Sequence, residues 1–311
     1  MKAIIRAEGG LTQAEVDDPI CVQGKDVLIK IAYVGICRTD IRVANGGIRV
    51  EEPRIIGHEL SGIIVAQGSL VGGFQIGDRV VAHPEQACGK CHFCVQGECC
   101  QQPLMIGLHR DGAFAEYIKL SVDMLYLLPE SVSMLHGAFV EPLAAASAVN
   151  NLIFDRQARA CIYGDNRIGK LVKLFLDPHF DRPVDLLEVG ELIGHSHPMT
   201  GSYDLVVDAD LSELNVRAMV HLLKLKGCLV LRSRTFNKVP LDVGEITRKE
   251  LSIRSVNYGS FPESIGLLAS GRLCIDEFLG ENYPLSSYAD ALDSAAVSDQ
   301  KVFLCVDDAI Q

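Results

Sequence analysis

The 311-residue chain contains no tryptophan, and aromatic residues make up only 6% of it. It also has no cluster of basic residues, and its net charge is −11, which argues against nucleic acids and anionic membranes as partners. No apolar run reaches the length of a membrane-spanning helix, and the first residues lack the apolar core of a signal peptide. These absences predict a cytoplasmic protein that binds neither nucleic acid nor membrane.

Apolar residues and cysteines, in contrast, are plentiful. Hydrophobic residues make up 48% and charged residues 22% of the chain, which is ordinary for a globular protein long enough for two domains. Five of the eleven cysteines lie between positions 88 and 100. Such clustering favours metal binding in a reducing compartment over a framework of disulfide bonds.

The stretch from Gly35 to Gly68 combines side chains that suit a tetrahedral zinc ion. Cys37 supplies a thiolate, and the adjacent His58 and Glu59 supply an imidazole and a carboxylate. Taken alone, the cysteine fits a small buried hydrophobe and the histidine fits a core residue with satisfied hydrogen bonds. Glycines on both sides of the His-Glu pair, followed by an apolar run, predict instead that His58 enters a strand from a tight turn.

A second cysteine pattern is typical of a structural zinc site. Cys88, Cys91 and Cys94 are each separated by two residues on a loop that contains glycine. A tetrahedral site needs a fourth ligand, and both Cys99 and Cys100 follow closely. The other interpretation is a reduced surface loop without metal. A closed site of four thiolates would stabilise the domain and would not take part in catalysis.

The hydrophobic pattern changes along the chain. Residues 1 to about 140 contain many short alternating segments separated by turns, which predict a partly open β-barrel. From about 144 to 260, strand and helix patterns alternate, which predicts a doubly wound parallel sheet. Within it, one apolar helical face is predicted to continue to Leu223, with Gly227 as the helix end and a strand over 228–231.

A dinucleotide-binding turn is predicted between a strand at 160–163 and a helix that runs to about residue 176. Gly164 and Gly169 match the first and third glycines of the Gly-x-Gly-x-x-Gly fingerprint, but Asn166 replaces the second. That second glycine lets the backbone approach the pyrophosphate of the cofactor. Asparagine tolerates a left-handed backbone, but its side chain takes up room.

The next predicted strand ends near an acidic residue. Glu188 follows Gly169 by nineteen residues, close to the spacing of the carboxylate that binds the adenosine ribose. A carboxylate there favours NAD(H) over NADP(H), because it repels a 2′-phosphate, although a solvated glutamate at a strand end fits equally well. Only about a dozen residues then precede the next strand, at 203–208. His195 and His197, within this short stretch, are interpreted as loop residues and not as metal ligands.

The motifs Cys37-x-Thr39-Asp40 and Gly57-His58-Glu59-x-x-Gly62-x5-Gly68 together resemble the zinc signature of the medium-chain dehydrogenase/reductase superfamily, the zinc alcohol dehydrogenases. The resemblance covers nearly the whole chain. It implies a GroES-like β-barrel catalytic domain over 1–143 and 261–311 and a Rossmann nucleotide-binding domain over 144–260. The nucleotide domain is shortened, because the family has a helix, a strand and a helix where this chain has about a dozen residues.

The resemblance implies a catalytic zinc ion bound by Cys37, His58 and Glu141. The polyol and threonine dehydrogenase branches also have glutamate at the position of Glu141, although a glutamate at the start of a helix needs no metal to be favourable. Glu59 is the competing ligand, because the family can exchange that residue with water at the metal.

The same resemblance assigns roles around the metal. Thr39 is expected to relay the proton of the substrate hydroxyl, and Arg38 to contact the pyrophosphate, unless it is a simple surface arginine. Arg42 stands where the family often has a histidine that passes the proton to solvent, and arginine cannot serve as a base at neutral pH. The onward route of the proton is therefore unassigned.

The cysteine loop departs from the family pattern. In the family the fourth structural cysteine usually follows the third by eight residues, and in this chain that position is Gln102. The loop is therefore interpreted as shortened, with Cys100 as the fourth ligand and Cys99 as the alternative.

The predicted function is a zinc-dependent oxidoreductase that transfers a hydride between a nicotinamide cofactor and a secondary alcohol or polyol, or its ketone. Zn²⁺ is expected at a catalytic and a structural site, and family habit suggests a homodimer or homotetramer. Asn166 and the shortened nucleotide domain support a rival, a zinc-binding scaffold without redox chemistry. A third hypothesis is a zinc enzyme that polarises a carbonyl group without net oxidation. Intact Cys37, Thr39 and His58 favour retained catalysis.

Overall fold

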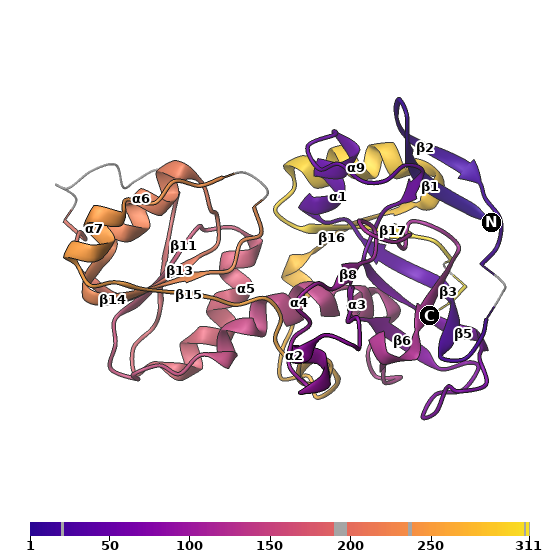
Figure 1. The fold of residues 1–311 in the computed structure, drawn as a ribbon, viewed down its shortest axis with the longest axis horizontal. Helices are drawn as coiled ribbons and strands as arrows, with labels where there is room; N and C mark the ends of the chain where they lie inside the picture. The colour runs from indigo at the N-terminus through magenta and orange to yellow at the C-terminus, as the bar shows by residue number, and fades with distance from the viewer. Residues whose placement is uncertain (20–21, 190–197, 236–237, 308, 311) are drawn as a thin grey trace. The chain divides into compact units, whose positions relative to one another are not determined.

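A computed structural model describes residues 1–19, 22–189, 198–235, 238–307, 309 and 310. The chain forms two compact units, the first made of residues 1–142 and 261–311 and the second of residues 143–260 (Figure 1). The first boundary lies one residue before the predicted position. His195 and His197 lie outside the described residues. Among those described, no helix is both long and apolar enough to cross a membrane.

The first unit consists mainly of short strands, as predicted. They are β1 Lys2–Ala7, β2 Gly10–Glu15, β3 Asp26–Gly35, β4 Arg54–Ile55, β5 Glu59–Gln67, β6 Arg79–Ala82, β7 Glu85–Gln86, β8 Leu104–Met105, β9 Tyr117–Ser121, β10 Leu125–Leu127, β16 Leu279–Pro284 and β17 Lys301–Cys305. The largest sheet has the order β10-β6-β5-β3-β17-β16, and β9 also pairs with β3. Smaller sheets have the orders β2-β1-β4 and β7-β8.

The centre of this unit is the antiparallel pair β3 and β5. Strand β17, which lies far away in the sequence, pairs with the other edge of β3. Side chains that alternate along these strands point into one continuous apolar core, because successive residues of a strand face opposite sides. Its buried members include Ile4, Ile29, Ile31, Ile56, Leu60, Ile64, Phe114 and Leu304.

Short helices accompany the strands of the first unit. They are α1 Arg38–Ala44, α2 His92–Val95, α3 Met134–Ala138, α8 Phe261–Ala269 and α9 Tyr288–Val297, and α4 Val140–Ser147 crosses from the first unit into the second. Only Ile36 and Cys37 separate the end of β3 from the start of α1. This junction holds Cys37.

The second unit is a parallel sheet, as the alternating pattern predicts. Its strands are β11 Ala160–Tyr163, β12 Asp185–Leu187, β13 Tyr203–Asp208, β14 Leu223–Leu231 and β15 Ser252–Ser255, and its helices are α5 Arg167–Leu176, α6 Glu213–Leu222 and α7 Val243–Arg248. The strand order is β12-β11-β13-β14-β15. In the described part of the chain, β12 is therefore an edge strand, which agrees with a shortened nucleotide-binding fold.

One predicted boundary in this unit is wrong. Helix α6 ends at Leu222, and Gly227 lies within β14 and is not the end of a helix. Leu223 leaves the helical pattern because it pairs with Tyr203 at the start of the neighbouring strand. The ladder is then irregular, and Lys226 takes a positive φ of 61° before regular pairing resumes at Cys228. Pairing within the sheet thus overrides the local helical periodicity.

Candidate metal centres and active site

The first candidate metal centre lies where β3 ends and β5 begins. Possible ligand atoms of Cys37, His58 and Glu59 lie within 4.8 Å of one another. Cys37 is the N-cap residue of α1, and Glu59 opposes Gly35 in the antiparallel ladder of β3 and β5. The strand register therefore brings together ligands that lie about twenty residues apart in the sequence.

Gly57 fixes the approach of the chain to His58. Its φ of 93° is a conformation that side-chain-bearing residues rarely adopt, and a Cβ atom there would lie 2.2 Å from the ring of Phe114. The backbone amide of Ala113 donates to the Gly57 carbonyl at 2.9 Å, and the amide of Phe114 donates to Ile56 at 2.8 Å. The predicted tight turn before the histidine is therefore present, and a second loop holds it in place.

Asp40, in the first turn of α1, connects the two segments that form this centre. Its buried carboxylate accepts the backbone amide of Cys37 at 2.8 Å and that of Gly57 at 3.2 Å. The Oδ1 atom of Asp40 also lies 3.4 Å from Nδ1 of His58. A carboxylate beside one ring nitrogen orients the imidazole and leaves Nε2 as the nitrogen for a metal.

The electrostatics of His58 follow from these neighbours. Complete burial disfavours the charged imidazole, but the Asp40 carboxylate and the Cys37 thiol outweigh it and raise the pKa of His58 well above its usual value. In the absence of metal, the ring therefore holds a proton strongly. A metal ion binds the neutral imidazole, so it must displace this proton.

Lys301 supplies the positive charge beside Glu59. Its Nζ atom donates to Glu59 Oε1 at 2.6 Å and contacts Oε2 as well, and it also donates to the Ile36 carbonyl at 3.1 Å. Both side chains of the ion pair are 2% exposed. The motif analysis missed this partner because Lys301 follows Glu59 by 242 residues.

These residues fit a zinc ion. The centre combines a thiolate donor, an imidazole and a carboxylate, a donor set typical of this metal. His58 Nδ1 is buried without a well-formed hydrogen bond, and its 3.4 Å contact with Asp40 is long. The Asp40 carboxylate lies on the Nδ1 side of the ring, so the other ring nitrogen, Nε2, is the one left for a metal ion.

The other predicted members of the centre lie in defined positions but outside this group. Thr39 is half-buried and Arg38 exposed, both in the first turn of α1. Glu141 is 7% exposed near the start of α4, and its carboxylate does not belong to the group of ligand atoms within 4.8 Å. Its role as the third ligand stays a prediction.

The second candidate metal centre contains four thiols. The ligand atoms of Cys88, Cys91, Cys94 and Cys100 lie within 4.8 Å of one another. The Sγ atom of Cys91 lies 3.4 Å from that of Cys94, and Cys100 Sγ accepts the amide of Cys88 at 3.3 Å. Cys99 is exposed and does not belong to this group. The geometry therefore favours Cys100 as the fourth ligand.

Backbone amides of this loop favour the thiolate form of Cys91. Hydrogen bonds from the amides of Gln101 and Cys94, together with the neighbouring thiols, lower the pKa of Cys91 to about 6. The hydrogen bond between the Cys91 and Cys94 thiols in turn raises the pKa of Cys94. Thiolates are the form that binds zinc, so the loop fits a structural ion.

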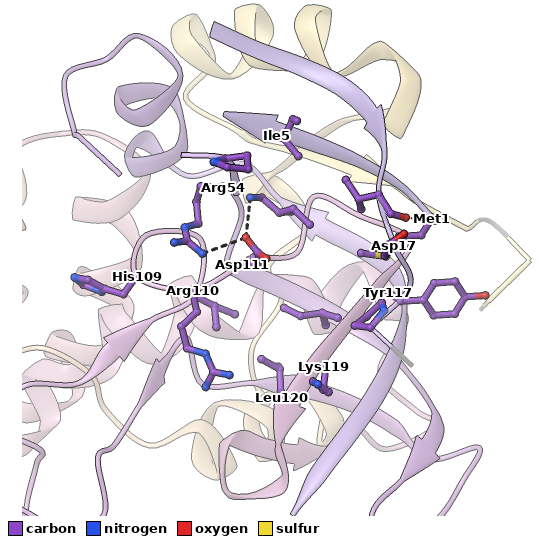
Figure 2. A pocket seen from close by; sticks show the side chains of 17 residues that line it. Met1, Ile5, Asp17, Arg54, His109, Arg110, Asp111, Tyr117, Lys119 and Leu120 are labelled. Carbon is purple, nitrogen blue, oxygen red and sulfur yellow. Dashed lines mark hydrogen bonds and ion pairs between the residues drawn. The ribbon is translucent and has the colours of Figure 1, made fainter. Parts of the chain in front are cut away.

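A separate cavity of about 450 Å³ lies in the first unit, and Figure 2 shows its lining. Arg54 and Asp111 form an ion pair there at 3.2 Å, and Asp111 also accepts the amide of Ile55 at 3.1 Å. None of the residues of the two candidate metal centres lines this cavity. The Arg54–Asp111 pair instead holds the segment that leads to Gly57.

The predicted cofactor residues of the second unit gather at one end of the parallel sheet, whereas Arg38 belongs to the first unit. Gly164, with a φ of 126°, follows β11, and its amide donates to the Leu187 carbonyl at the end of β12. Glu188 is exposed directly after that strand. Asn166 is the N-cap residue of α5, and Gly169 lies in its first turn. The turn and the acidic residue are thus neighbours, as a site for adenosine ribose and pyrophosphate requires.

Comparison with known proteins shows which proteins have a similar sequence. Residues 23–130 match the alcohol dehydrogenase GroES-like domain. A 2-dehydro-3-deoxy-L-galactonate 5-dehydrogenase from Pseudoalteromonas atlantica is 29% identical over 301 residues, covering 88% of each chain. Sorbitol dehydrogenase from Bacillus subtilis is 29% identical over 304 residues, covering 87% of this chain and 86% of the relative. The first unit therefore contains an alcohol dehydrogenase GroES-like domain, and most of the chain is similar to dehydrogenases of polyols and sugar acids.

The fold is similar to that of solved dehydrogenases over nearly the whole chain. An alcohol dehydrogenase from Escherichia coli CFT073, solved with NADH, superposes with a TM-score of 0.87 at 24% identity and covers 98% of this chain and 99% of its own. The predicted fold class, a GroES-like barrel with a Rossmann domain, is confirmed.

The cysteine centre yields a test of the fourth ligand. Cys100→Ser is expected to lower the zinc content by about one ion per chain, because a structural site needs all four ligands. Cys99→Ser, the adjacent control, is expected to keep the full content. Zinc per chain is measured by atomic emission after removal of loosely bound metal. The reverse result would identify Cys99 as the ligand.

The buried pair of Glu59 and Lys301 yields a test of stability. Lys301→Met leaves a buried carboxylate without its countercharge, which is expected to lower the free energy of unfolding by about 3–5 kcal/mol. Urea unfolding of the metal-free protein, followed by circular dichroism, measures the change.

Lys25→Met is the control, because its partner Asp123 is exposed, and exposed pairs contribute only about 0–1 kcal/mol. The double variant Lys301→Met/Glu59→Gln is expected to recover part of the lost stability. Equal effects of the two lysine variants would contradict a stabilising role for the buried pair.

Proposed function

We propose that this protein is a zinc-dependent dehydrogenase that transfers a hydride between a nicotinamide cofactor and a secondary alcohol or polyol, or the corresponding ketone. The observation that carries the proposal is the convergence of Cys37, His58 and Glu59 around the carboxylate of Asp40. The relatives named 2-dehydro-3-deoxy-L-galactonate 5-dehydrogenase and sorbitol dehydrogenase support a polyhydroxylated substrate.

Each residue of the centre has a distinct task. Cys37, His58 and a carboxylate, from Glu141 or Glu59, hold the zinc ion. A zinc ion held there would polarise the oxygen of a bound alcohol and lower the pKa of its hydroxyl group. Asp40 orients the His58 ring, and Lys301 neutralises Glu59.

Other residues handle the proton and the cofactor. Thr39 Oγ1 accepts the proton of the substrate hydroxyl as it releases its own hydroxyl proton to water, because the permanently charged Arg42 cannot take that proton as a base. Arg38 and the Gly164–Gly169 turn contact the pyrophosphate of the cofactor. Glu188 binds the adenosine ribose, which favours NAD(H) over NADP(H).

The wider context of the proposal rests on the family and on the reduced cysteines. Four clustered thiols with a zinc-binding arrangement suit a cytoplasmic protein. A homodimer or homotetramer is the proposed assembly.

A second candidate is a zinc-binding scaffold without redox chemistry. The observation that favours it is the side chain of Asn166, which occupies the first turn of α5 where a cofactor phosphate would bind. In that case the two zinc ions would stay bound while nicotinamide cofactors would not bind.

Calorimetric titration of the zinc-loaded protein with NADH and then NADPH separates the two candidates. The dehydrogenase is expected to bind NADH saturably and more tightly than NADPH, and to reduce NAD⁺ with a member of a panel of sugar alcohols, sugar acids and diols. Absence of binding of either cofactor at millimolar concentration, with about two zinc ions per chain, would refute the dehydrogenase and favour the scaffold.

Asp40→Asn tests the chemistry of the metal centre. It removes the carboxylate that orients His58, and a change of this kind lowers metal affinity or activity by about 10–100-fold. Zinc affinity is measured by competition with a chelator, alongside kcat/KM for the best alcohol.

Asp111→Asn is the matched control, because Asp111 also accepts a backbone amide of the segment before Gly57 but does not contact His58. An equal loss in both variants would show that Asp40 acts only through the local fold.

A further inference from the structure

The side chain of Asn166 accepts hydrogen bonds from backbone amides at the start of α5. Its Oδ1 atom accepts the backbone N–H groups of Ile168 at 3.0 Å and Gly169 at 3.1 Å. The first amides of a helix have no partner within the helix, and in dinucleotide-binding folds they face the pyrophosphate. In this chain two of those donors are already bound by a neutral side chain.

The other end of the same side chain spans two neighbouring strands. Asn166 Nδ2 donates to the Ala209 carbonyl at 3.1 Å, and Ala209 follows β13 directly. Strands β11 and β13 are adjacent and parallel, and β12 lies on the other side of β11. The strand order reverses at this point, and ligands of such sheets bind in the crevice outside the carboxyl ends of these strands. The Asn166 side chain lies across it.

The rest of the turn keeps the features of a dinucleotide site. Gly164 has a φ of 126°, and a Cβ atom on Gly169 would lie 2.0 Å from the Gly164 carbonyl oxygen, so both positions require glycine. Asn166 has a φ of −135°, an extended conformation that any residue adopts. Asn166 therefore does not adopt the left-handed backbone conformation that asparagine tolerates. At this position it differs from glycine only by its side chain.

We propose that Asn166 is a built-in competitor of the cofactor pyrophosphate and sets the affinity of this protein for dinucleotides. The inference rests on the proposed function, because it concerns the nicotinamide cofactor of that reaction. The side chain must leave the two amides and the Ala209 carbonyl before the pyrophosphate can bind them. Only molecules in which the Asn166 side chain has left these groups can bind the pyrophosphate. If its hydrogen bonds are formed in about nine of ten molecules, the affinity for the cofactor is about tenfold weaker.

Asn166→Gly tests the proposal directly. Glycine at an N-cap position costs a helix little, and it restores the fingerprint at the second position. The dissociation constant of NADH, measured by calorimetry on the zinc-loaded protein, is expected to fall about tenfold, which corresponds to about 1.4 kcal/mol. ADP-ribose, which carries the pyrophosphate without nicotinamide, is expected to gain by the same factor.

Two further variants keep the test independent of folding. Asn166→Ala also removes the hydrogen bonds, and it serves if the glycine variant does not fold. Ser212→Gly removes the N-cap hydrogen bond of α6 in the same unit, where Ser212 accepts the amide of Asn215 at 3.2 Å. This control is expected to keep the dissociation constant of NADH within about twofold of the natural chain. Thermal unfolding establishes that each variant is folded.

The outcomes separate this inference from the proposed function. Binding of NADH by the natural chain, with no tighter binding in either Asn166 variant, overturns the inference and leaves the dehydrogenase intact. A gain for NADH without a gain for ADP-ribose also overturns it, because the effect then lies at the nicotinamide end. No binding of NADH or NADPH by any variant overturns both.

Discussion

The candidate site of the first unit depends on the interactions of one buried carboxylate, that of Asp40. It accepts the amides of Cys37 and Gly57, which belong to different segments, and it lies beside the ring of His58. A buried carboxylate is stable only when donors surround it, so its presence demands that these segments meet. The glycine turn, the strand register and the helix start are therefore parts of one arrangement.

Much of this centre could be predicted from the sequence, because its ligands lie in short motifs. Cys37, His58 and Glu59 occur at family spacing, and a tight turn before a strand requires a residue such as Gly57. The cysteine loop could be predicted equally well, apart from the choice between Cys99 and Cys100. That choice depends on which thiol turns inward, and neighbouring residues of a loop carry no periodicity that decides it.

Other features depend on contacts between distant residues. Lys301 could not be identified because nothing near it in the sequence indicates that Glu59 is its partner. The end of α6 was misplaced because pairing of Leu223 with Tyr203 outweighs the helical pattern. Asn166 was recognised as a departure from the fingerprint, but its hydrogen bond to Ala209 depends on the order of strands in the sheet.

The position of Lys301 in the chain also bears on how the protein is made. Strands β3 and β5 leave the ribosome long before β17, which carries the lysine and pairs with β3. Until then, the carboxylate of Glu59 has no countercharge from Lys301, and its burial would be costly. The nascent chain therefore has an electrostatic reason to keep this end of the sheet open to water. We therefore expect the metal centre to close only after β17 has been made, 242 residues after Glu59.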